Sequence, residues 1–165
     1  MLRTLSAILL LVVVISCKKN NSDEISPEHK EQAAKLQTHL EANSFRLDKY
    51  YSEKPIDYID TDQVVKAETE LWQYVSEWLH DDEYIFNANG TVTIKQNAIK
   101  IPTSNSETIT KSFDVEADKD GVLFRFVGHE YQDLNYRLIS FNDSVVKVSA
   151  TWNNKTVISE YKLLE

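Results

Sequence analysis

From Glu83 to near the end of the chain, apolar and polar residues alternate with a period of two, and turn-forming sequences interrupt the alternation repeatedly. Side chains at every second position of a β-strand share one face of a sheet, so this period predicts strands with one buried face. The predicted strands cover residues 84–86, 92–94, 108–115, 122–127, 135–141, 145–151 and 156–164. We therefore expect this part of the chain to be all β.

The turns between these strands are short and of the kind that joins neighbouring strands. Asn89-Gly90 is a strong hairpin signal because both residues tolerate a positive φ. One further strand is predicted over Phe45–Ile56, where the alternation is again two. Eight strands joined mostly as hairpins predict a mainly β fold, an antiparallel up-and-down barrel, since closure leaves no open edge.

Two helices are predicted before this region. Ser26 and Pro27 provide an N-cap and a proline at the first helical position, and good helix formers continue to Ala42. The apolar stripe of this first helix is thin, so we expect it to lie on the domain surface. A second helix is predicted from about Asp62 to Leu79, between the first two strands, because apolar residues recur there near helical spacing.

Composition excludes several classes of protein. The 165 residues carry a formal net charge of −8, which argues against a nucleic-acid partner. A single Cys excludes an internal disulfide framework and a multi-cysteine zinc site. Three scattered Gly residues leave no glycine-rich loop to hold a phosphate.

The first residues predict export. An apolar run from Leu5 to Ile15 follows Arg3, and as a helix it would rise only about 16 Å, against a hydrocarbon core of about 30 Å. Residues 1–16 are therefore predicted to be a signal peptide. The sequence Val14-Ile15-Ser16-Cys17 resembles a bacterial lipobox, and this resemblance implies that Cys17 becomes the acylated first residue of a lipoprotein.

Residues 17–25 are polar and have no apolar periodicity, which predicts a flexible tether. The short sequence Ser22-Asp23-Glu24 is similar to acidic signals that direct lipoproteins of Bacteroidetes to the outer face of the outer membrane. The expected location is the outer membrane, with the periplasmic and the surface-exposed face both open. The expected membrane contact is the lipid on Cys17.

Residues 81–91 read D-D-x-Y-x-F-x-x-x-G-T, with Tyr84 and Phe86 as the aromatic positions. Together with Phe45–Ile56, Tyr136-Arg137-Leu138-Ile139 and the terminal Ser159-Glu160-Tyr161-Lys162, this sequence resembles the lipocalin-like lipoproteins common in Bacteroidetes. The resemblance spans about residues 44–165 and implies a lipocalin-like domain over 26–165. Phe45 stands where a Trp is usual, and no cysteine precedes Asp81.

Candidate metal and catalytic groups each have a simpler explanation. The run from His80 to Glu83 holds four potential ligands but reads better as a solvated corner between helix and strand. The run from Asp118 to Gly121 lacks the further ligands of a calcium loop and reads better as a tight turn. His29, His39, His80 and His129 lie apart in the sequence, although His129-Glu130 could line a barrel mouth. We therefore expect no cofactor, no metal and no enzymatic activity.

Aromatic residues provide the best candidates for a binding site. In an eight-stranded barrel, inward side chains either fill the interior or line a cavity for one small ligand. The predicted inward set is Tyr84, Phe86, Phe124, Phe126, Tyr136 and Trp152. A cavity would bind a small apolar or amphiphilic ligand, whereas a filled core would favour an accessory module that holds an envelope protein or a glycan.

Overall fold

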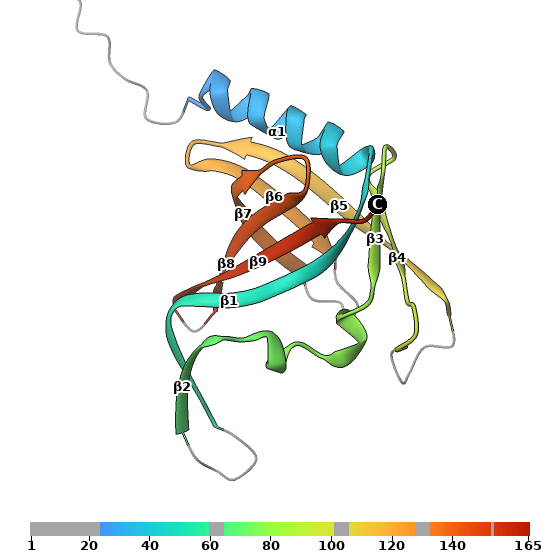
Figure 1. The fold of residues 1–165 in the computed structure, drawn as a ribbon. Helices are drawn as coiled ribbons and strands as arrows, with labels where there is room; N and C mark the ends of the chain where they lie inside the picture. Colours follow the sequence, from blue (N-terminus) through green and yellow to red (C-terminus); the bar gives the residue numbers. More distant parts are fainter. Residues whose placement is uncertain (1–23, 60–64, 101–105, 128–132, 153) are drawn as a thin grey trace, which may run out of the picture.

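The computed structural model describes residues 24–59, 65–100, 106–127, 133–152 and 154–165 (Figure 1). An α-helix, α1 (Pro27–Glu41), precedes the strands. The strands are β1 (Ser44–Ile59), β2 (Val65–Glu70), β3 (Glu83–Asn87), β4 (Thr91–Lys95), β5 (Thr108–Asp118), β6 (Gly121–Val127), β7 (Asp133–Phe141), β8 (Val145–Trp152) and β9 (Lys155–Leu163). Two short 3₁₀ helices, η1 (Trp72–Tyr74) and η2 (Glu77–Leu79), lie between β2 and β3.

In the described part of the chain, β1 and β3 to β9 form a closed antiparallel barrel of eight strands. From β3 to β9, each strand pairs with the next one in sequence. β9 then closes the ring against β1, from the Phe45–Leu163 pair to the Ser52–Val157 pair. The predicted eight-stranded barrel is thus confirmed, and closure satisfies the backbone groups that an open edge would leave unpaired.

The helix predicted over about 62–79 is wrong. Val65–Glu70 forms β2, which pairs with the outer part of β1 in an arm beyond the barrel (Figure 1), while 60–64 lie outside the described residues. Leu71 is 1% exposed against Ile56 and Val157, whereas Val65 is 65% exposed. Because the long strand β1 offers backbone partners to residues 65–70, strand pairing overrides the helical spacing.

The first predicted helix is confirmed as α1. Ser26 Oγ accepts a hydrogen bond from the backbone N–H of His29 at 3.1 Å, and Pro27 opens the first turn. The buried stripe holds only Ala33, Leu36 and Leu40, which cover one end of the barrel (Figure 1). Within the described residues, no helix has the length and apolar character needed to span a membrane.

The turn between β3 and β4 differs slightly from its prediction. The N–H of Gly90 donates to the carbonyl of Asn87 at 3.0 Å, and Asn87 pairs with Thr91 across the hairpin. Gly90 has a φ of +76°, whereas Asn89 is not among the residues with positive φ. The loop therefore contains residues 88–90, and only its last residue needs the left-handed region.

The turn between β5 and β6 is the tight turn predicted for residues 118–121. Asp118 pairs with Gly121, and its Oδ1 accepts a hydrogen bond from the N–H of Asp120 at 2.8 Å. Arg137 of β7 donates to both carboxylate oxygens of Asp118, at 2.5 and 2.6 Å. This pair joins the hairpin tip to the neighbouring strand.

We expect the pair of Asp118 and Arg137 to make the free energy of unfolding depend on pH only in the acidic range. The Arg137 hydrogen bond lowers the pKa of Asp118 from 3.8 to about 2, against the opposing effect of burial. A carboxyl group with a lowered pKa stabilises the folded state above its ordinary pKa and loses that contribution as the pH falls toward the folded value. The difference in urea midpoint between wild type and Asp118→Asn should be constant above about pH 5 and shrink between about pH 4 and pH 2. A difference that persists unchanged at about pH 2 would contradict the lowered pKa.

Candidate functional site

The structure brings together five of the six predicted aromatic residues inside the barrel. Tyr84, Phe86, Phe124, Phe126 and Tyr136 are between 1% and 7% exposed. Ring centroids lie 5.3 Å apart for Phe124 and Phe126, and 5.5 Å apart for Phe86 and Phe124. Rings at these distances and tilted geometries pack directly on one another.

Trp152, the sixth predicted residue, lies apart from this cluster. It has the same strand parity as the buried Val146 and Val148, but it is the last residue of β8 and is 43% exposed. The alternation of side chains along β8 therefore continues beyond the end of the barrel core. Parity alone could not reveal where along a strand the enclosed interior stops.

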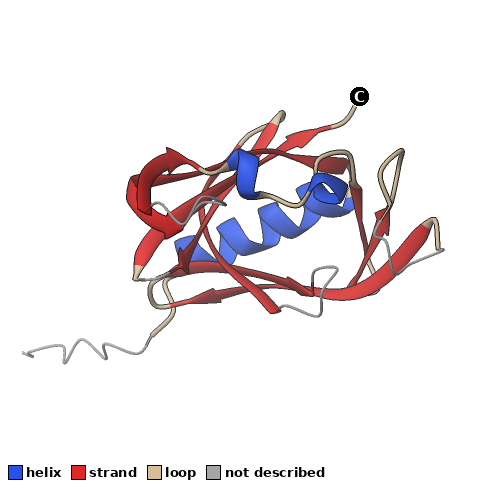
Figure 2. Ribbon diagram, turned by 90° about the horizontal axis from the view of Figure 1, so that it is seen from below, coloured by secondary structure: helices blue, strands red, loops and turns tan. Residues whose placement is uncertain are grey.

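The interior becomes polar toward the end opposite α1. Figure 2 views the molecule from that side, with α1 behind the ring of strands. The buried polar residues Ser52, Asp82, Gln96 and Ser159 are at most 5% exposed. β1 and β4 run away from α1, and β3 runs toward it. Ser52 is the last residue of β1 that pairs with β9, Gln96 directly follows β4, and Asp82 directly precedes β3. Among the described residues, buried polar side chains therefore lie among apolar ones toward the end of the barrel away from α1.

Buried tyrosines also bring hydroxyl groups into the barrel interior. The hydroxyl of Tyr161 donates to the hydroxyl of Tyr136 across 3.4 Å. Burial raises the pKa of Tyr84, Tyr136 and Tyr161, and for Tyr84 the nearby carboxylate of Asp82 raises it further. These phenols therefore stay neutral at physiological pH and can both donate and accept hydrogen bonds.

Sequence reasoning missed Tyr161 and Ser159 as site residues. They lie on β9, where the predicted strand 156–164 already placed both on one face. β9 pairs with β1 and β8, which sets Ser159 opposite Tyr50 and Val148. The alternation along β9 is a sufficient signal for both residues, and Tyr161 is aromatic like the predicted set.

The segment from Leu71 to Asp82 returns from the arm to β3. Trp72 and Val75 of this segment pack against the barrel core, and the ring of His80 stacks on Trp72 with centroids 4.3 Å apart. Asp81 Oδ2 accepts hydrogen bonds from the backbone N–H groups of Ala98, at 2.8 Å, and Ile99, at 3.2 Å. Asp81 thereby fastens this segment to the loop that follows β4.

The prediction of a solvated corner between helix and strand for His80 to Glu83 needs correction. Asp82 is fully buried, and Glu83 forms an ion pair of 3.3 Å with Lys95. His80 and Asp81 engage other partners, as described above, so the four side chains do not converge. Among the described residues, no group of three or more His, Cys, Asp or Glu side chains could hold a metal ion.

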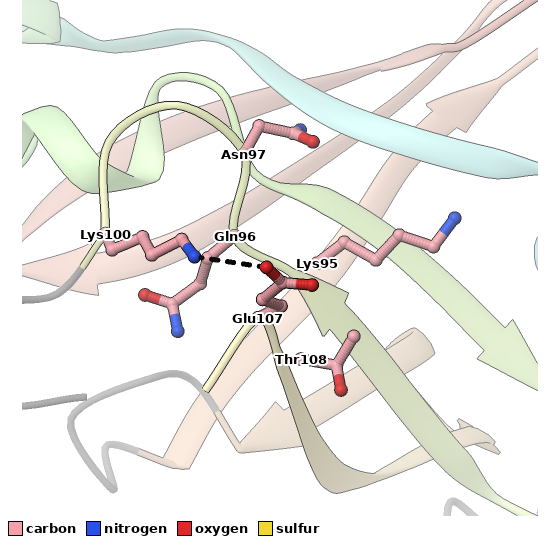
Figure 3. Close-up of a pocket in the computed structure, with 6 residues that line it drawn as sticks. All are labelled: Lys95, Gln96, Asn97, Lys100, Glu107 and Thr108. Atoms are coloured by element: carbon pink, nitrogen blue, oxygen red, sulfur yellow. Dashed lines mark ion pairs between the residues drawn. The ribbon is translucent and has the colours of Figure 1, made fainter. Parts of the chain in front are cut away.

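A polar pocket of about 390 Å³ opens at the ends of β4 and β5 (Figure 3). Its lining residues are Lys95, Gln96, Asn97, Lys100, Glu107 and Thr108. Lys100 and Glu107 reach toward each other across it, with 3.6 Å between Nζ and Oε1. Since both side chains are well exposed, this pair adds little binding energy, and the pocket lacks the apolar walls of a typical ligand site.

The remaining candidates serve the fold or lie beyond the described residues. His29 Nδ1 lies 2.9 Å from the carbonyl of Asp118, which ties α1 to the β5–β6 turn. His39 packs with its ring centroid 5.5 Å from those of both Phe45 and Phe141. Cys17, His129 and Glu130 lie outside the described residues.

Comparison of the chain with protein-family models, with curated proteins and with solved structures gives no match. The function of the barrel therefore has to be inferred from its own geometry.

Proposed function

We propose that the chain is a lipid-anchored protein of the bacterial outer membrane whose lipocalin-like barrel binds a small amphiphile without transforming it. The observation that carries this proposal is the division of the interior. Apolar side chains lie beneath α1, whereas the buried polar residues Ser52, Asp82 and Gln96 lie toward the opposite end, and the hydroxyls of Tyr136 and Tyr161 lie 3.4 Å apart inside the barrel. A closed eight-stranded barrel is compatible with the lipocalin-like resemblance noted above.

An interior that holds both apolar side chains and buried polar groups suits the two parts of an amphiphile. Burial of an apolar chain contributes about 25 cal/mol per Å², while an unpaired polar group in the same place would cost free energy. The neutral phenols of Tyr84, Tyr136 and Tyr161 offer hydrogen bonds to a polar headgroup. A wholly apolar ligand would form no hydrogen bonds with these phenol hydroxyls.

A neutral amphiphile tests the proposal. We expect 1-decanoylglycerol to form a one-to-one complex with the full-length Cys17→Ser chain in native mass spectrometry. The double variant Tyr136→Phe, Tyr161→Phe keeps both rings but removes the hydroxyls, and its dissociation constant should rise about fivefold. Tyr74→Phe is the matched control, since Tyr74 is 41% exposed and hydrogen-bonds Glu68 outside the barrel. Absence of any complex across a panel of amphiphiles would overturn the proposal.

A second candidate function is an accessory module that holds an envelope protein or a glycan through its outer surface. The close packing of Phe86 against Phe113, with centroids 5.1 Å apart, favours it because packed rings leave less room for a ligand. Crosslinking in the native envelope followed by pull-down tests this alternative. A partner recovered from wild type, together with no amphiphile bound, would favour it over the first candidate.

A further inference from the structure

Two exposed cations stand opposite each other on the outer surface of the barrel, where β1 and β9 meet. Arg46 of β1 pairs directly with Lys162 of β9 in the strand register. Side chains in such a pair leave from the same face of the sheet, with their Cβ atoms about 5 Å apart. Both residues are exposed, while Phe45, Leu47 and Tyr161 beside them are buried in the barrel. Arg46 and Lys162 therefore project together from the outer face.

This cation pair differs from the cations next to it on the same face. Lys49 of β1 and Lys147 of β8 both form ion pairs with Glu160 of β9, at 2.9 and 3.5 Å. Among the residues that the structure describes, neither Arg46 nor Lys162 forms an ion pair with a carboxylate. The positive charge of these two side chains is therefore not balanced within the described part of the chain.

The opposed like charges do not help the fold itself. Like charges directly opposite each other destabilise a pair of strands. Glu83 on the neighbouring strand β3 does not relieve the repulsion, because it forms an ion pair of 3.3 Å with Lys95. An anion bound between Arg46 and Lys162 would remove the repulsion and accept charge-assisted hydrogen bonds from both. The pair thus suits an anionic partner outside the chain.

The proposed lipid anchor brings a bilayer within reach of this face. Residues 17–25 can span at most about 30 Å. The helix that follows them, α1, has 15 residues and is therefore about 22 Å long, and β1 starts at Ser44, directly after it. The segment before α1 is thus long enough to let Arg46 touch the bilayer. Because the anchor keeps the barrel beside the lipid, two weak contacts form there at a high effective concentration.

We propose that Arg46 and Lys162 bind the phosphate groups of anionic phospholipids, so that the outer face of β1 and β9 lies against the bilayer. This proposal rests on the lipid anchor of the proposed function and adds a second membrane contact to it. A basic residue near an anionic membrane surface strengthens attachment about fivefold. Two such residues orient a barrel that is already anchored. The strand β5, which lies opposite β9 in the ring, then faces away from the bilayer.

The orientation of the anchored barrel tests the proposal. Cys17 is the only cysteine, so an introduced cysteine is the only free thiol of the lipidated protein. Ser144→Cys places a label beside Lys162, since the carbonyl of Ser144 accepts a hydrogen bond from the N–H of Leu163 at 2.8 Å. Thr110→Cys places the same label on the exposed face of β5.

Both labelled lipoproteins carry bimane and are reconstituted into vesicles of phosphatidylcholine, with or without phosphatidylglycerol. A lipid with a spin-labelled headgroup serves as the quencher of bimane fluorescence. In vesicles with phosphatidylglycerol, we expect the label of Ser144→Cys to be quenched about threefold more than that of Thr110→Cys. In vesicles of phosphatidylcholine alone, the two labels should be quenched equally.

Removal of both charges separates this contact from the anchor. The double variant Arg46→Gln, Lys162→Gln should abolish the difference in quenching in vesicles with phosphatidylglycerol. Lys30→Gln, Lys35→Gln removes the same charge from the exposed face of α1 and is the matched control, which should keep the difference. The urea midpoint of Arg46→Gln, Lys162→Gln should equal or exceed that of wild type, because a repulsion is removed. A lower midpoint would show that the pair serves the fold and would overturn the proposal.

The possible outcomes distinguish this proposal from the proposed function. Equal quenching of the two labels in vesicles with phosphatidylglycerol would overturn the second membrane contact and leave the anchored, amphiphile-binding barrel standing. Failure of the wild-type lipoprotein to stay with any vesicle would contradict the anchor and therefore both. Loss of the difference on adding inorganic phosphate, but not sodium chloride of equal ionic strength, would identify a free phosphate as the occupant and overturn the assignment to the bilayer.

Discussion

Phe86→Ala is expected to lower the free energy of unfolding by about 3–5 kcal/mol, as for large aromatic residues truncated in well-packed cores. Phe86 is 2% exposed and its ring packs against Phe45, Phe113, Phe124 and Phe126. Removing it deletes contacts on several strands at once, from β1 across the barrel to β6. Urea denaturation followed by circular dichroism measures the change in midpoint and slope.

Trp152→Ala is the control for this prediction. Trp152 is also a large aromatic residue on a strand, but it is 43% exposed and lies outside the barrel core. Its truncation should change stability by no more than about 0.5 kcal/mol. If Phe86→Ala cost less than about 1 kcal/mol, the aromatic cluster would not be the packed core of the barrel.

Cys17→Ser is expected to abolish membrane attachment. Each buried CH₂ of an acyl chain contributes about 0.8 kcal/mol to membrane binding, and one chain alone binds only marginally. We therefore expect the several acyl chains implied by the lipobox resemblance to hold the wild-type protein in the membrane fraction. The measurement is cell fractionation together with metabolic labelling by radioactive palmitate.

Ser22→Ala is the matched control for Cys17→Ser. It changes a hydroxyl residue of the predicted tether and leaves Val14-Ile15-Ser16-Cys17 intact. This variant should keep both the label and the membrane association. Palmitate label on Cys17→Ser, or a wild-type protein without label, would contradict the predicted anchor.

Local signals predicted those elements whose backbone partners lie close in the sequence. The Ser26-Pro27 start of α1 and the hairpin turns at Gly90 and at Asp118–Gly121 all appear where they were expected. In each case the residues that form the turn or cap also supply its hydrogen bonds. Sequence reading succeeds here because the necessary interactions are local.

The β2 region shows where such reading fails. Leu71 and Trp72 belong to an apolar pattern with helical spacing, but Leu71 buries against Ile56 and Val157, and Trp72 packs on the barrel core. The apolar spacing indicated that these residues are buried, but it did not indicate which residues they pack against. Pairing of residues 65–70 with β1, and burial of Leu71 against Val157 far along the chain, decided the conformation of this region.

The candidate site shows the same division. Alternation predicted that Tyr84, Phe86, Phe124, Phe126 and Tyr136 point inward, and the structure agrees. It could not show that their rings contact one another, or that Trp152 lies beyond the enclosed part of the barrel. Strand parity specifies a face, whereas depth inside the barrel depends on how all the strands are staggered.

The amino-acid sequence by itself determined the eight strands of the barrel, their hairpin order and the helix before them, because alternation, turn residues and caps act between near neighbours. Only the tertiary structure decided that β2 replaces a helix and that buried polar side chains lie toward the end of the barrel away from α1. These properties depend on which strands meet and at what register, and contacts between residues far apart in the chain set both.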